Sequence, residues 1–170
     1  ELRGLLGWMA TLGNKIIQET IIDLDAYAVL ANGDPSQLES SSKRQLIHKL
    51  KQLEDTDPYF RRGDYFRRFS VSDFFTPDIL DEIKSILINH KDGLLHDLLL
   101  DLLVDSPIAS DLVTELTQVV VSDSETEYTR MSALACLVNT KDYNLFDIFG
   151  ILIFESSNIS LSMISTIIEK

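Results

Sequence analysis

The chain of 170 residues is poor in the residues that cross-link or break a fold, with one cysteine, seven glycines and four prolines. A single cysteine, Cys136, excludes an internal disulfide and is typical of a reducing compartment, so we expect a cytoplasmic protein in which Cys136 is a buried apolar residue on a helix. The low content of glycine and proline predicts few long loops. No run of eighteen apolar residues and no signal peptide is visible, so the sequence predicts no membrane span.

Basic residues are also scarce, since 27 acids against 15 bases give a net charge of −12. The charge is uneven: residues 43–68 carry eight bases and four acids, whereas residues 69–170 carry five bases and seventeen acids. An acidic surface repels the phosphate backbone of nucleic acids. The composition therefore favours other proteins, or neighbouring domains of the same chain, as partners, with nucleic acid and membrane disfavoured.

Apolar residues make up 45% of the chain and repeat at a fixed distance. A shift of 34 residues places Leu100, Leu103 and Val104 on Leu134, Leu137 and Val138. A shift of 33 places Ile79, Ile83 and Ile86 on Leu112, Leu116 and Val119, and a second such shift reaches Leu145, Phe149 and Leu152. Self-similarity with this period, one helix pair per repeat, is typical of α-solenoids.

The repeats predict an all-α fold in which antiparallel helix pairs stack as a short HEAT-like α-solenoid. We expect helices over 77–89, 94–104, 108–121, 126–138, 143–155 and 159–169, the first starting at Thr76-Pro77-Asp78 with Thr76 as cap. Val119 to Val121 favour a strand locally, but their place in the repeat predicts helix. Residues 76–170 then form the repeat region, and residues 1–75 form an N-terminal helical subdomain that ends in a basic and aromatic connector.

The N-terminal part shows helical spacing of apolar residues over 2–12, followed by helices over 15–24 and 26–31. Asn14 and Asp25 are suitable N-caps for the second and third of these helices. We expect the inward side of the second helix to comprise Ile16, Ile17, Thr20, Ile21 and Leu24. A fourth helix through Leu53 has Ser40, Ser41 and Ser42 as alternative caps. Glycines among residues 2–13 allow close approach of another helix.

Three sequence patterns contain residue types that could carry chemistry, but their spacing indicates no catalytic, cofactor-binding or metal-binding residues. The segment Gly7 to Lys15 resembles a phosphate loop, but five residues separate its glycines and Ile16 replaces the required hydroxyl. His90, Asp92, His96 and Asp97 match no metal-ligand spacing. Asp97, Asp101 and Asp105 recur every four residues and predict a solvated outer face, because no partner histidine or nucleophile accompanies them.

The segment 59–75, which we call the arginine–aromatic block, combines arginines with aromatic side chains, the residue types that dominate protein interfaces. Two interpretations stand: the arginines neutralise acids within the molecule, or they contact a partner. If the second holds, the contact residues are Arg61, Arg62, Tyr65, Arg67 and Arg68.

The N-terminal half resembles the helical region that follows the NTPase in bacterial NACHT-type signal-transducing ATPases with numerous domains. The likeness covers roughly residues 5–105 and rests on Leu5, Trp8-Met9-Ala10, the segment Asp25–Ala31, Gly33-Asp34, Arg44, Leu46 and Leu50, followed by degenerate helix pairs. It implies HEAT-like repeats that sense or relay a trigger, often in phage defence, behind an NTPase whose motifs match nothing in this chain.

The sequence therefore predicts a non-catalytic helical-repeat interaction or sensor module. Because the chain starts at Glu1 and ends at Lys170 inside an amphipathic helix, we expect an excised piece of a larger NACHT-like NTPase. A purely structural spacer between domains is one alternative, and an unrecognised enzyme is a second.

Overall fold

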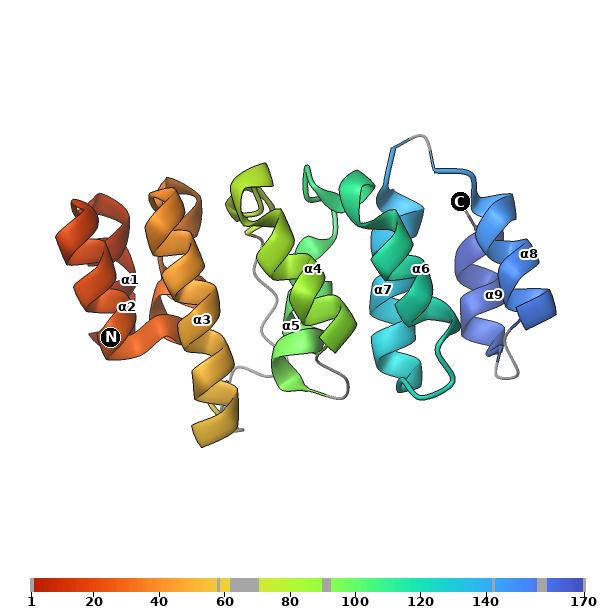
Figure 1. The fold of residues 1–170 in the computed structure, drawn as a ribbon, viewed down its shortest axis with the longest axis horizontal. Helices are drawn as coiled ribbons and strands as arrows, with labels where there is room; N and C mark the ends of the chain where they lie inside the picture. The colour runs from red at the N-terminus through yellow and green to blue at the C-terminus, as the bar shows by residue number, and fades with distance from the viewer. Residues whose placement is uncertain are drawn as a thin grey trace. The chain divides into compact units, whose positions relative to one another are not determined.

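The computed structural model describes residues 2–57, 59–61, 71–89, 93–141, 143–155 and 159–169, and these contain helices and no strand (Figure 1). The prediction of an all-α chain is confirmed for this part, including the helical state of Val119 to Val121. The α-helices are α1 (Leu2–Leu12), α2 (Lys15–Asn32), α3 (Ser40–Thr56), α4 (Leu80–Asn89), α5 (Leu94–Leu103), α6 (Val113–Val121), α7 (Glu127–Asn139), α8 (Leu145–Glu155) and α9 (Leu161–Ile168). Short 3-10 helices are η1 (Pro35–Gln37), η3 (Ser72–Phe74), η4 (Pro77–Ile79) and η5 (Ala109–Leu112).

The chain divides into two compact units, Glu1–Glu82 and Ile83–Lys170. The boundary falls within α4, while the division between residues 75 and 76 stays a sequence-based prediction. Each unit is built from helices that pack on their neighbours in the chain, and in unit 2 α7 also packs against α5 and α9.

Helix α2 is two helices joined at one residue. Asp25 has φ −156° and ψ 86°, outside the helical region, and its Oδ1 accepts a hydrogen bond of 2.9 Å from the Ala28 amide. Asn14 Oδ1 accepts likewise from the Ile17 amide at 3.2 Å. The two predicted caps are therefore confirmed, and the predicted helices 15–24 and 26–31 are the two halves of α2.

The chain reverses direction at Asp25. After a short turn, the first half of α2 runs back antiparallel to α1. The second half runs parallel to α1, because residues further along α1 contact residues further along this half of α2. Arg3 Nε donates to Asp25 Oδ2 at 2.9 Å, and further along, Thr11 Oγ1 accepts from the Asp34 amide at 2.7 Å. The first half of α2 in turn lies along α3.

The core of unit 1 lies between α2, α3 and the segment before α4. Tyr27 packs edge-on against Phe60, with ring centroids 5.5 Å apart, and both are buried. Phe74 and Phe75 form a second edge-on pair at 5.2 Å, beside the buried Lys43, whose Nζ donates to Thr76 Oγ1 at 3.1 Å. Burial lowers the pKa of Lys43, and the Phe74 ring and the charges of Asp78 and Asp34 favour its cation.

Three predicted helix starts differ in detail. Thr76 precedes η4 but its side chain accepts no capping hydrogen bond, and its hydroxyl accepts one from Lys43 Nζ at 3.1 Å. Helix α3 begins at Ser40 with Glu39 in the cap position, so none of the three serines caps it. The predicted helix 108–121 opens as the 3-10 helix η5 before continuing as α6.

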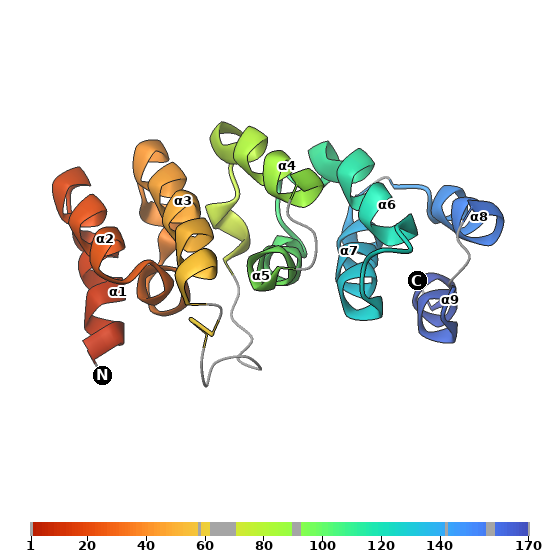
Figure 2. The same ribbon diagram turned by 60° about the horizontal axis from the view of Figure 1, so that its bottom comes forward.

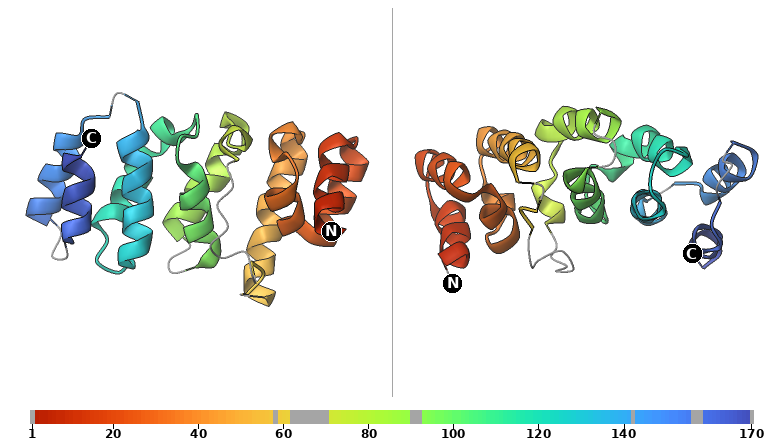
Figure 3. Two further views of the ribbon diagram at one scale, coloured as in Figure 1. Left: turned by 180° about the vertical axis from the view of Figure 1, so that it is seen from behind. Right: turned by 90° about the horizontal axis from the view of Figure 1, so that it is seen from below.

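Unit 2 is organised around α7, which packs against α5, α6 and α9, while α8 packs against α6 and α9 (Figures 2 and 3). Helix α7 can be surrounded on several sides because its buried residues spread around it: Thr129, Arg130, Ala133, Leu134, Cys136 and Leu137. The predicted burial of Cys136 is confirmed, and its Sγ donates to the Leu100 carbonyl of α5 at 3.2 Å.

Positions that are equivalent in the repeat are buried alike. Leu100 and Leu134 are fully buried, as are Leu103 and Leu137, while Val104 and Val138 are half-buried in both repeats. The shift of 34 residues therefore aligns residues with the same environment, which supports the register read from the sequence.

The predicted acidic outer face of α5 is wrong for two of its three carboxylates. Asp97 Oδ1 accepts from Thr129 Oγ1 at 2.8 Å, and Asp101 accepts from Tyr128 Oη at 2.6 Å and from Ser132 Oγ at 2.9 Å. These carboxylates thus join α5 to α7 through a polar seam. Spacing alone places them on one side of α5 but does not reveal that hydroxyl groups of α7 cover that side.

Asp105 lies beyond the end of α5 and does not share that side. It is exposed and has φ 63°, the left-handed conformation that aspartate tolerates better than most residues. The third predicted carboxylate is therefore part of a turn.

Candidate interaction surface

In helix α1, all of which is described, the most exposed residues are all apolar, while the Arg3 side chain is partly exposed and paired with Asp25. Leu2, Leu5, Trp8, Met9 and Leu12 are exposed, with Trp8 at 54% and Leu12 at 82%. They lie three or four residues apart and so share one side of the helix. The opposite side, which faces the rest of unit 1, carries the buried Gly7 and Ala10. The small residues of α1 are thus buried and its large apolar residues are exposed, whereas a packed helix normally buries its large apolar residues.

Glycine sets the orientation of α1. A Cβ added to Gly7 would lie 2.5 Å from the Gly33 amide nitrogen and 2.6 Å from the Asn32 carbonyl carbon. Real Cβ atoms do not come that close to backbone atoms, so only glycine lets α1 approach the end of α2 here. This confirms the expected close helix approach for Gly7. Because the packing side is backbone and small residues, the large apolar residues point outwards.

The first half of α2 extends this apolar surface. Ile21 is buried as predicted, but Ile16, Ile17, Thr20 and Leu24 are exposed, so their predicted inward orientation is wrong. The buried side of this segment carries Gln18, Ile21 and Ile22 instead. We define the α1–α2 face as the exposed apolar residues of both helices: Leu2, Leu5, Trp8, Met9, Leu12, Ile16, Ile17 and Leu24.

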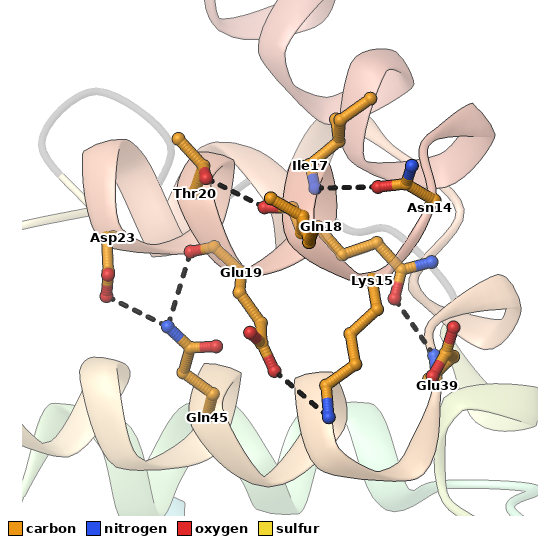
Figure 4. A network of polar contacts seen from close by, with 10 residues as sticks. Asn14, Lys15, Ile17, Gln18, Glu19, Thr20, Asp23, Glu39 and Gln45 are labelled. Carbon is orange, nitrogen blue, oxygen red and sulfur yellow. Dashed lines mark hydrogen bonds and ion pairs between the residues drawn. The ribbon is translucent and has the colours of Figure 1, made fainter.

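A network of polar contacts fixes α2 against α3 (Figure 4). Gln45 Nε2 donates to Asp23 Oδ1 at 2.9 Å and to the Glu19 carbonyl at 3.3 Å. Buried Gln18 accepts from the Glu39 amide at 3.1 Å and donates to the Gly13 carbonyl. Since polar bonds hold the buried side of α2, its exposed isoleucines and Leu24 are not needed to anchor it.

A pocket of about 600 Å³ opens in unit 1 between the middle of α2 and the end of α3. Its charged lining includes Arg3, Asp23, Asp25 and Lys49, which form two ion pairs of 2.9 and 3.0 Å. Hydrogen bonds from Lys49 and Gln45 lower the pKa of Asp23. That carboxylate is therefore ionised near neutral pH and acts as an acceptor, so it is unsuited to donate a proton in catalysis.

The predicted partner-contact residues are only partly described. Arg61 is buried with 4% of its surface exposed, and the neighbouring Phe60 is in the core of unit 1. Arg62, Tyr65, Arg67 and Arg68 lie outside the described residues, so a contact through them stays a prediction. For Arg61 the burial matches the interpretation in which the block packs inside the molecule.

The other chemical candidates are placed as follows. Gly7 lies inside α1, and Lys15 begins α2 and pairs with Glu19 at 3.7 Å. His96 is fully buried, with Nδ1 4.0 Å from Glu125 Oε2, whereas His90 and Asp92 lie outside the described residues. Within the described ranges, no three His, Cys, Asp or Glu side chains are placed to hold a metal ion.

A search of the described residues found no helix with the length and apolar character that a membrane crossing requires. Comparison of the chain with family models, with characterised proteins and with solved structures found no match.

Sequence reasoning missed the α1–α2 face, although a signal for it is present. The sequence shows a stripe of Leu2, Leu5, Leu6, Met9 and Leu12 at helical spacing with Trp8 beside it, but an apolar stripe at helical spacing usually marks a core side. What distinguishes α1 is the rest of the helix, which has one charged residue, Arg3, and two glycines, so no polar side is available to face water.

Proposed function

We propose that this chain is a helical-repeat protein-interaction module, and that the α1–α2 face is the surface that binds its partner. The observation that carries the proposal is the reversal of burial in α1, which leaves Trp8 and four other large apolar side chains exposed. Several large apolar side chains exposed along one side of a helix, a tryptophan among them, are typical of protein-binding sites. The partner that fits is an amphipathic helix or helix pair, because its apolar stripe can lie along α1.

A HEAT-like solenoid is the architecture we propose for the repeats. Helices one repeat apart run parallel in both units: α1 beside the second half of α2, the first half of α2 beside α3, and α5 beside α7. Asp97 of α5 contacts Thr129 of α7, and Leu100, further along α5, contacts Cys136, further along α7, so the two helices run in the same direction. Parallel placement of equivalent helices is the relation that stacked helix pairs produce.

The resemblance of the sequence to NACHT-type proteins implies that such a module would follow an NTPase and would sense or relay a trigger. In that setting the α1–α2 face is the contact with a neighbouring domain or an incoming protein. A passive spacer is the alternative, and it requires no such face.

Site-specific photocrosslinking tests the proposal. A benzophenone amino acid replaces Trp8 in the full chain, expressed in cells at native level, and a matched chain carries it at Gln52, an exposed polar position of α3. We expect a discrete adduct from position 8 that is absent from position 52, whether its second member is this chain or another protein. Equal, diffuse labelling from both positions would refute an interaction role for the face.

A further inference from the structure

The sequence contains one asparagine that is followed directly by glycine, in the pair Asn32-Gly33. In such a pair the glycine amide nitrogen can attack the asparagine side chain, because no Cβ shields that nitrogen and glycine reaches backbone conformations closed to other residues. Asn32 is the last residue of α2, and both residues lie where α1 packs against the end of that helix. The reactive pair is therefore part of a contact between two helices.

The fold requires glycine at position 33. A Cβ added to Gly33 would lie 2.5 Å from the Gly7 carbonyl oxygen and 2.9 Å from both the Gly7 carbonyl carbon and Thr11 Oγ1. Real Cβ atoms do not come that close to other atoms, and the two Gly7 atoms belong to the main chain and cannot rotate away. A side chain at position 33 would slow the attack on Asn32 but would push α1 off α2. The close approach of the helices thus keeps the reactive pair in the chain.

The folded chain holds Asn32 and Gly33 in a geometry that opposes the attack. The Gly33 amide donates to the Val29 carbonyl at 3.3 Å, and Asn32 Nδ2 donates to the Ala28 carbonyl at 3.4 Å. Ring closure requires the Gly33 nitrogen to lose its proton and to turn towards the Asn32 side chain, which the helical backbone at Asn32 does not permit. The last turn of α2 must therefore open before the reaction can start.

Helix α1 keeps this last turn closed. The Gly7 backbone lies against Asn32 and Gly33, and Thr11 Oγ1 accepts from the Asp34 amide at 2.7 Å, one residue beyond the pair. Helix ends fray unless other elements hold them. Because opening of the turn requires α1 to withdraw, the rate of the attack depends on the fraction of chains in which α1 is undocked.

We propose that Asn32 is a deamidation site that docking of α1 protects, and that the reaction prevents α1 from docking again. The Gly33 nitrogen forms a bond to Asn32 Cγ, and ammonia leaves from Cγ with the proton that the Gly33 nitrogen gives up. Water then opens the five-membered ring, at one carbonyl to give aspartate and at the other to give isoaspartate, in which the main chain runs through Cβ and Cγ. This inference does not depend on what the α1–α2 face binds.

The isoaspartate product does not fit the contact. It lengthens the main chain by one carbon between position 32 and Gly33, where a Cβ on Gly7 would already lie 2.6 Å from the Asn32 carbonyl carbon. The aspartate product keeps the main chain and places a carboxylate at the negative end of the α2 dipole, which is a weak effect. Isoaspartate should thus undock α1, whereas aspartate should leave it in place. A chain that forms isoaspartate loses the docked arrangement and does not regain it.

Deamidation rates in four full-length chains test the protection: wild type, Gly7→Ala, Thr11→Val and Gly4→Ala. All are kept at pH 8, and peptide mass spectrometry follows the change of amide to carboxyl at position 32. We expect wild type and Gly4→Ala to react slowly, because a Cβ on Gly4 meets nothing within 4 Å. Gly7→Ala introduces a clash and Thr11→Val removes the acceptor of the Asp34 amide, so both should react about fivefold faster or more.

Wild type unfolded in guanidinium chloride gives the upper limit of the rate, and circular dichroism verifies that each variant is folded. Thr11→Val adds no bulk to the contact and decides the question if Gly7→Ala does not fold. A native wild type that reacts as fast as the unfolded chain, or a folded Thr11→Val chain that reacts no faster than Gly4→Ala, overturns the protection by α1.

The products test the undocking. Ion exchange separates the reacted chains, an isoaspartate methyltransferase identifies the isoaspartate form, and amide hydrogen exchange across α1 measures docking. We expect faster exchange across α1 in the isoaspartate chain than in Asn32→Asp, which should resemble wild type, while Asn32→Gln should react far more slowly at position 32. An isoaspartate chain with the α1 exchange of wild type overturns the proposed loss of docking.

Discussion

Replacing Gly7 with alanine should push α1 away from the end of α2. The added Cβ would meet Gly33 N at 2.5 Å, Asn32 C at 2.6 Å and Ala28 O at 3.0 Å, and all three are backbone atoms that cannot rotate away. Restoring ordinary contact distances requires α1 to withdraw by about 1 Å. That shift would stretch the 2.7 Å hydrogen bond from the Asp34 amide to Thr11, which lies on the same side of α1.

The magnitude follows from two opposing terms. Overpacking of this kind costs about 1–3 kcal/mol, and alanine is favoured over glycine inside a helix by about 1 kcal/mol. Gly4→Ala is the matched control, because Gly4 is in the same helix and a Cβ there would meet nothing within 4 Å. Gly4→Ala should therefore stabilise α1 slightly, and the difference between the two variants should isolate the clash at about 1–3 kcal/mol.

Urea unfolding followed by the fluorescence of Trp8 measures this difference, since the only tryptophan lies in α1. The midpoint should fall for Gly7→Ala and rise or stay constant for Gly4→Ala. If Gly7→Ala is as stable as Gly4→Ala, then α1 does not pack through Gly7, and the outward orientation of the α1–α2 face loses its physical basis.

Four further outcomes are expected. Leu103→Ala and Leu137→Ala, at equivalent and fully buried positions, should each cost roughly 2–5 kcal/mol in urea unfolding; a change below 0.5 kcal/mol at either position contradicts the repeat register. In a double-mutant cycle, Asp101→Ala and Tyr128→Phe should couple by about 1 kcal/mol, because they share a 2.6 Å hydrogen bond, whereas additive effects would contradict the seam. Burial raises the pKa of the Cys136 thiol to about 12, so a disulfide reagent at pH 8 should react only as fast as the chain opens; fast labelling of the native chain would exclude this burial. Burial and then Asp101 raise the pKa of Tyr128 from 10.0 to about 12, so ultraviolet titration of its hydroxyl should lag behind free tyrosine, and the stability contributed by Tyr128 should be complete below pH 10 and lost as the pH rises through about 12.

The sequence predicted elements whose determinants are local. Asn14 and Asp25 were recognised as caps because a short side chain that bonds the third amide ahead needs no information from elsewhere in the chain. Leu103 and Leu137 were placed in the core because helical spacing separates an apolar side from a polar one. These inferences succeeded because every determinant lies within a few residues.

Features that depend on distant contacts were not predictable. Its spacing in the sequence predicts that Asp101 is solvated. The hydrogen bond that it accepts comes from Tyr128, 27 residues away, and no local pattern indicates that partner. The stripe of Leu2, Leu5, Leu6, Met9 and Leu12, with Trp8 beside it, is typical of a core side, because spacing locates a stripe without revealing what covers it. The candidate interaction surface was therefore missed for the same physical reason as the polar seam.

The break in α2 has a consequence for how the chain can vary. One carboxylate of Asp25 serves both helices: Oδ1 caps the second half of α2, and Oδ2 binds Arg3 of α1 at 2.9 Å. Asparagine would keep the cap and lose the charge, while glutamate would keep the charge on a side chain one methylene too long for the cap. No single substitution at position 25 preserves both contacts, and the two are not lost equally: Asp25→Asn or a replacement of Arg3 would remove the ion pair that aligns α1 and leave the cap of the turn in place, whereas loss of the cap requires a change at position 25 itself.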